Sequence, residues 1–63
     1  MKNIEMKQEG NVLVIRVDLT KTFGPSASGK TIIIASTEGN APVASPTGER
    51  IAVGINVYKP RSL

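Results

Sequence analysis

The stretch that decides the fold is GPSASGKTIIIAS, residues 24–36. Its first eight residues match the G-x-x-x-x-G-K-[ST] pattern of a phosphate loop, in which a strand leads into a helix whose N–H groups hold nucleotide phosphates. The three isoleucines after Thr31 oppose a helix, because β-branched side chains lose χ1 freedom against the preceding helical turn. We therefore predict a loop between two strands at this place, not a nucleotide-hydrolysing site.

The rest of the machinery for nucleotide hydrolysis is also missing from the sequence. That chemistry needs a far larger parallel sheet than 63 residues can build, and an acidic residue beyond the loop that holds magnesium. Asp18 is the only aspartate, and it precedes the string. Two interpretations stay open: a plain turn, and a turn whose backbone N–H groups attract anions, with Ser26, Ser28 and Lys30 adding donors.

Alternation of apolar and polar residues predicts β-strands on both sides of this stretch. Residues 3–19 form a predicted hairpin around the Gly10-Asn11 turn, and residues 31–36 and 51–59 are two further strands. The segments 20–30 and 37–50 are rich in Gly, Pro and Ser and are predicted loops. Pro42 and Pro46 lack a backbone donor, which excludes a central strand in the second loop.

These segments predict one all-β domain over residues 1–63, a four-stranded and mainly antiparallel twisted sheet or half-barrel. A chain this short buries only about 60% of the surface that it exposes when unfolded. It has no Cys and no His, so neither a disulfide nor a thiolate or imidazole zinc site can stabilise it. Residues 31–36 are apolar on both faces. We therefore expect a homodimer in which a second copy supplies the missing cover.

Catalytic groups are scarce in this sequence. Without His, a general base would be one of five carboxylates with a pKa raised by burial, and none of them lies inside an apolar run. We expect a protein that is not an enzyme and has no catalytic residue, cofactor or metal site. The longest apolar runs, residues 12–15 and 32–35, are far shorter than the roughly 20 residues of a membrane span. No secretory signal is seen, and we expect a cytoplasmic location without membrane contact.

A net charge of +3 permits an anionic partner. We predict a small basic nucleic-acid-binding protein of low sequence specificity, for DNA or RNA that is single-stranded or bound non-specifically. Loop cations and the Gly/Ser turn would contact phosphates, and one or two aromatic rings would stack on bases. The residues expected to bind nucleic acid are Lys21, Phe23, Ser26, Ser28, Gly29, Lys30, Arg50, Tyr58 and Lys59.

Two alternatives accompany this prediction. The protein could be a structural or protein-interaction module that acts by strand-edge pairing or self-assembly, without catalysis. Within the predicted site, Phe23 could pack back onto the core as a plug of its loop, because large rings tend to be buried. Lys30→Glu separates the two functions, since it should abolish anion binding and leave strand pairing mostly intact.

Overall fold

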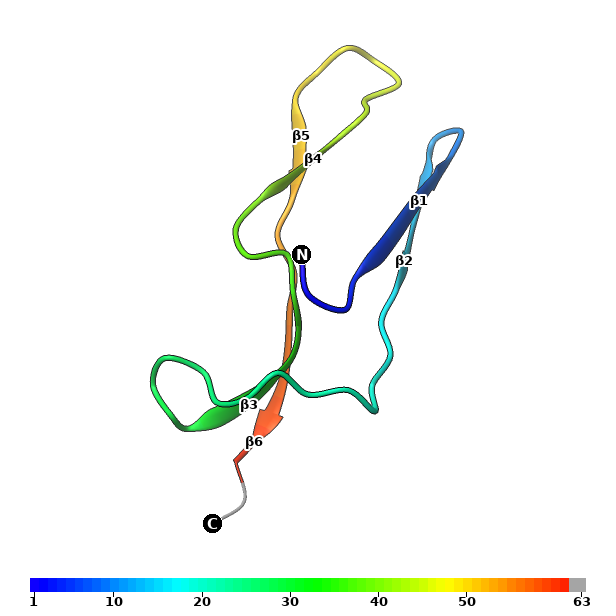
Figure 1. Ribbon diagram of the computed structural model, residues 1–63. Coiled ribbons are helices and arrows are strands. Elements are labelled where there is room, and N and C mark those ends of the chain that lie inside the picture. Colours follow the sequence, from blue (N-terminus) through cyan, green and yellow to red (C-terminus); the bar gives the residue numbers. More distant parts are fainter. Residues whose placement is uncertain (62–63) are drawn as a thin grey trace.

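The computed structural model describes residues 1–61, and within them it contains six short strands and no helix (Figure 1). The strands pair antiparallel as three two-stranded sheets, β1 with β2, β3 with β6 and β4 with β5. Their bounds are β1 Glu5–Glu9, β2 Val12–Arg16, β3 Thr31–Ser36, β4 Ala41–Val43, β5 Ile51–Val53 and β6 Asn56–Pro60. The predicted all-β, antiparallel character is confirmed. A four-stranded sheet or half-barrel completed by a second copy stays a prediction.

The first hairpin, β1–β2, forms where the alternating pattern predicted it. Glu9 and Val12 are paired across the two-residue turn Gly10-Asn11, and Gly10 has a φ of 58°. A positive φ at the first central residue suits a type II′ turn, whose twist matches that of the strands. The pairing ends at Glu5 and Arg16, so the ladder is shorter than the predicted hairpin 3–19.

Strand β3 is central because both of its edges carry hydrogen bonds. β6 pairs with one edge. Along the other edge, Phe23 N–H donates to Ile33 O at 2.8 Å, and Ile33 N–H donates to Gly24 O at 3.0 Å. Lys2 and Ser36 exchange two backbone hydrogen bonds at the end of the same edge. Segment 23–26 and the N-terminal residues thereby satisfy backbone groups that an edge strand would leave open.

Strand β3 contains a β-bulge at Ile34. Ile33 lies opposite Tyr58 and Ala35 lies opposite Val57, so Ile34 is one additional residue in β3. Its carbonyl accepts a hydrogen bond from Asn3 Nδ2 at 3.0 Å, and Asn3 Nδ2 also donates to Asp18 O. Ile34 and Ala35 are the buried hydrophobic residues of the described chain, at 7% and 0% exposure. The core is therefore centred on the middle of β3.

The second predicted loop, 37–50, contains a strand that the sequence did not indicate. Ala41–Val43 forms β4 and pairs with β5. Pro42 is tolerated there because β4 pairs with β5 alone and is an edge strand. The predicted strand 51–59 is in turn broken at Gly54 and Ile55 into β5 and β6. The segment from β3 to β4 thus runs antiparallel to the segment from β5 to β6 as one long, interrupted hairpin (Figure 1).

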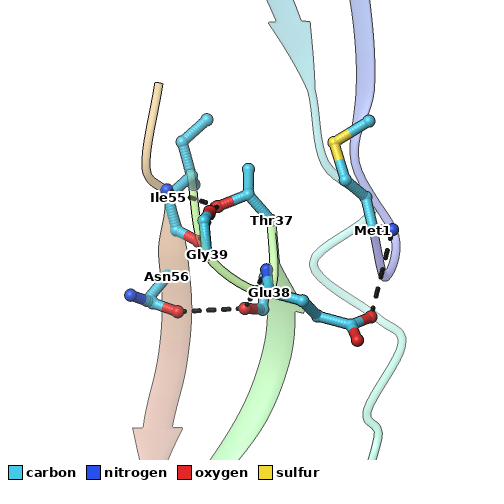
Figure 2. Close-up of polar contacts among 7 residues, drawn as sticks. Met1, Thr37, Glu38, Gly39, Ile55 and Asn56 are labelled. Carbon is cyan, nitrogen blue, oxygen red and sulfur yellow. Dashed lines mark hydrogen bonds and ion pairs between the residues drawn. The ribbon is translucent and has the colours of Figure 1, made fainter. Parts of the chain in front are cut away.

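Thr37 joins the two segments of the long hairpin where the strands are interrupted (Figure 2). Thr37 N–H donates to Ile55 O at 3.0 Å, and Ile55 N–H donates to Thr37 Oγ1 at 3.0 Å. The hydroxyl also donates to Gly39 O. Thr37 is the buried polar residue of the described chain, at 7% exposure, and these bonds satisfy it. A threonine side chain thus replaces the ladder where the strands separate.

The molecule is more extended than a chain of its length usually is. Its radius of gyration is 13.8 Å, where a compact domain of this length has about 10.6 Å. Its accessible surface is 4858 Å², about 950 Å² more than a compact monomer of this mass exposes. Val12, Leu19 and Tyr58 are among the large apolar side chains that remain exposed. The single chain therefore encloses only a small core.

Candidate nucleic-acid interface

The GPSASGKT string forms a turn between two extended segments, as the isoleucines after it predicted. Gly29 N–H donates to Ser26 O at 2.9 Å and closes a turn over residues 26–29. Ser26 N–H donates to Thr31 O at 2.8 Å, and Pro25 forms a bridge with Ile32. Gly29 has a φ of 73°, which a residue with a side chain adopts only under strain. The string leads into β3 and not into a helix.

The hydroxyl groups of this turn form a chain of hydrogen bonds. Thr31 Oγ1 donates to Ser26 Oγ at 2.8 Å, and Ser26 Oγ lies 3.1 Å from Ser28 Oγ. Lys30 N–H donates to Ser28 Oγ at 3.4 Å. Hydroxyls that bond to nearby groups of their own turn hold its conformation. These hydrogen bonds therefore hold the turn in one conformation, which positions Lys30 directly before β3.

Three cationic residues lie at this end of the β3–β6 sheet. We call the group formed by Lys30, Lys59 and Arg61 the cationic end. Arg61 N–H donates to Lys30 O at 3.1 Å, and Arg61 Nη1 donates to Gly29 O at 3.4 Å. Lys59 pairs with Ile32 in the ladder. No Asp or Glu occurs between Asp18 and Glu38 or after Glu49 in the sequence. The cationic end thus has no carboxylate from the strands and turn that form it.

A groove of about 240 Å³ lies beside the cationic end, on one face of the β3–β6 sheet. Ile33 and Tyr58 are directly opposed in the ladder and so share this face. The Tyr58 side chain is exposed. The groove is lined by Ser26, Thr31, Ile33, Ala35, Asn56, Val57 and Tyr58. None of the three cations lines the groove, but Lys30 and Arg61 adjoin the turn that contributes Ser26 to it.

Six of the nine predicted binding residues belong to this region, and Arg61, which is not among the nine, lies with them. The six are Ser26, Ser28, Gly29, Lys30, Tyr58 and Lys59. A signal for Arg61 existed: Pro60 closes the strand that pairs with Thr31, so antiparallel register brings the next residue beside Lys30. That signal needed the pairing partner of the last strand, which the alternation pattern does not specify.

Lys21, Arg50 and Phe23 lie elsewhere. Lys21 lines a separate open pocket of about 420 Å³ with Arg16, Asp18 and Glu5, where carboxylates offset its charge. Arg50 precedes β5 at the far end of the long hairpin (Figure 1). Phe23 lies along β3 on the edge opposite to β6 and remains 42% exposed. The ring is therefore neither a buried plug nor a neighbour of Tyr58 in the sheet.

The carboxylates do not gather into a metal site in the described part of the chain, where no group of three or more Asp, Glu, His or Cys comes together. Among residues 1–61, no helix is long and apolar enough to cross a membrane. The hydrogen bond from the Thr20 hydroxyl, with the Thr20 N–H and the charge of Lys21, lowers the pKa of exposed Asp18. This change favours the ionised carboxylate, the opposite of what a general base near neutral pH needs.

Comparisons with protein-family models, with curated proteins and with solved structures find no match to this chain.

Proposed function

We propose that this protein binds nucleic acid with low sequence specificity and holds the phosphate backbone at the cationic end. One observation carries the proposal. The antiparallel pairing of β3 with β6 brings Lys30 beside Arg61, close to Lys59 and Tyr58, and the described strands and turn of this region contain no Asp or Glu. Cations that face phosphates release condensed counterions, which favours binding without reading the base sequence.

Salt dependence is the direct test of this proposal. Three phosphate contacts on a single strand give a slope of log affinity against log salt of about −2, hence a loss of about 15-fold between 50 and 200 mM salt. The measurement is fluorescence anisotropy of a labelled single-stranded oligonucleotide over that range. Binding that is equal at both salt concentrations, or absent at both, contradicts the proposal.

A matched pair of variants locates the contact. Lys30→Gln removes one cation of the cationic end and should reduce the slope by about 0.7. Lys7→Gln is the control, because Lys7 lies in β1, is exposed, and has its ammonium 3.5 Å from Glu9. Both variants lower the net charge by one. An equal loss of affinity in both would show that overall charge, and not this site, attracts the nucleic acid.

A second candidate function is a structural module that assembles by strand pairing, and the extended shape favours it. The surplus exposed surface of about 950 Å² is similar to the roughly 800 Å² that each partner buries in a standard interface. β6 has a free edge as well. Thr31 and Ile33 direct their backbone groups toward segment 23–26, so Tyr58, opposite Ile33, directs its own away from β3.

Hydrogen exchange tests whether a second copy uses this edge. The Tyr58 amide faces outward, so its exchange should slow as the protein concentration rises if β6 pairs with another chain. The Val57 amide faces β3 in either case and is the internal control. Sedimentation of the same samples should give a mass of twice 6.7 kDa for the expected homodimer. A mass of 6.7 kDa at millimolar concentration, with no change in Tyr58 exchange, contradicts assembly.

A further inference from the structure

We infer that the groove on the β3–β6 face takes one unpaired base of a single strand, which rests on the proposed function and specifies its ligand. The groove of about 240 Å³ is smaller than the roughly 300–1,000 Å³ of sites that enclose drug-sized molecules. It is open along the sheet face, so a chain can continue past it. A base joined to its backbone suits such a site better than a free ligand that needs enclosure.

The apolar part of the groove matches the face of a base. Ile33, Ala35 and Val57 line it, and the exposed ring of Tyr58 borders it. Bases stack on aromatic rings with little regard to sequence, because every base has a π-face. An open sheet that carries an aromatic ring is a surface on which single strands bind in this way.

The polar part of the groove presents a fixed donor. Glu38 N–H donates to Ser36 Oγ at 2.9 Å, and Ser36 Oγ donates to Asn56 Oδ1 at 3.0 Å (Figure 2). Because the amide oxygen of Asn56 is already occupied by this hydroxyl, its Nδ2 group is left to donate to a ligand. Carbonyl and ring-nitrogen acceptors occur on the edges of bases. Asn56 therefore adds orientation without selecting one base.

The charges at the groove's end favour a nucleic acid over an apolar peptide. Lys30 and Arg61 do not line the groove, but they adjoin the turn that contributes Ser26 to it, so a backbone that continues from the seated base past this end of the sheet reaches two cations. A duplex satisfies the same cations but keeps its bases stacked and paired. Removing one base from the stack costs a few kcal/mol. The groove therefore distinguishes single strands from duplexes.

Tyr58 allows a direct test because it is the only tyrosine and the chain has no tryptophan. Its intrinsic fluorescence reports any base that stacks on the ring. Three probes are compared at low salt: a single-stranded thymidine octamer, a duplex of the same length, and inorganic polyphosphate. We expect the single strand to quench Tyr58, whereas the duplex and polyphosphate bind without quenching.

Two pairs of variants refine the test. Tyr58→Leu should weaken single-strand binding by about five- to 150-fold, while Tyr58→Phe keeps the ring and most of the affinity. Asn56→Ala should weaken it by about two- to tenfold, the range of one hydrogen bond. Asn40→Ala is the matched control, because Asn40 is also an exposed asparagine but does not line the groove.

The outcomes separate this inference from the proposed function. Salt-dependent binding of the single strand without quenching of Tyr58 overturns the groove as a base site and leaves phosphate binding intact. Equal quenching by duplex and single strand overturns it as well. If none of the three probes binds, the proposed function itself fails, and the inference fails with it. Quenching by the single strand alone, with the affinity weakened in Asn56→Ala and unchanged in Asn40→Ala, supports both.

Discussion

The β1–β2 hairpin and the β3–β6 pair are built from similar alternating sequences but are held in different ways. No residue of β1 or β2 is buried, although Leu13 and Ile15 belong to the clearest alternating stretch in the chain. β3 contains Ile34 and Ala35, which are both buried. The difference lies in pairing, because β3 has hydrogen-bonded neighbours on both edges while β1 and β2 pair only with each other.

This comparison shows that a strong strand pattern does not by itself place a strand in the core. The hairpin is connected to the rest of the molecule by polar groups: Asn3 reaches Asp18 and Ile34, and Gln8 Nε2 donates to Ala44 O. Isolated two-stranded hairpins are marginally stable in water. The centre of the molecule is instead stabilised by buried side chains, by the bulge at Ile34 and by the hydrogen bonds of the Thr37 side chain.

The largest expected effect comes from truncating the same residue type in the two regions. Ile34→Ala removes a buried side chain and should lower the free energy of unfolding by about 2–5 kcal/mol. Ile15→Ala should lower it by about 1 kcal/mol, because Ile15 is 39% exposed. Urea unfolding at low protein concentration measures both. Equal losses would show that the hairpin is as well packed as β3, and the comparison would fail.

The second prediction concerns the polar link between β3 and β6. Thr37→Val keeps the shape of the side chain but removes the hydroxyl that accepts from Ile55 N–H and donates to Gly39 O. An unpaired buried N–H lowers stability by about 1–3 kcal/mol. The exposed Thr22→Val is the control and should change the urea midpoint little. No difference between the variants would mean that the ladder does not depend on this hydroxyl.

A smaller effect is expected where β5 meets β6. A Cβ at Gly54 would lie 2.8 Å from Asn40 Oδ1, so Gly54→Ala forces the Asn40 side chain to move and should cost about 1 kcal/mol. Asn40→Ala in the same chain should restore most of the loss. A double-mutant cycle of thermal unfolding gives the coupling between the two positions. Additive effects would show that the contact between a Cβ at position 54 and Asn40 does not cause the loss of stability.

The smallest effect concerns the pH dependence of the region beside the hairpin. The Thr20 hydroxyl is the main cause of the lowered pKa of Asp18. Since the folded pKa is below the unfolded value, this carboxylate stabilises the fold above about pH 3.9, and the contribution is lost as the pH falls toward the folded pKa. Thr20→Val should raise the Asp18 pKa toward its ordinary value, measured by NMR titration of the Asp18 amide. An unchanged titration would exclude the hydroxyl as the cause.

Much of the candidate site was predictable from the sequence, because its turn depends on residues that are neighbours along the chain. The turn at residues 26–29 follows from Gly, Pro and Ser next to a β-branched run, so Ser26, Ser28 and Lys30 could be placed together. Arg50 was grouped with them because it is also a cation of a predicted loop. The antiparallel course of the long hairpin separates Arg50 from Lys30 and brings in Arg61 instead.

The sequence alone determined that the chain forms β-strands and that it turns at Gly10-Asn11. It also determined that GPSASGKT is a loop before a strand and not the phosphate-binding N-terminus of a helix. These features depend on side-chain branching and backbone freedom within a few residues. Only the tertiary structure decided the bulge at Ile34, the short β4 inside a predicted loop, and the break at Gly54 and Ile55. Those features depend on which distant backbone groups meet, and a local alternating pattern contains no information about its partner.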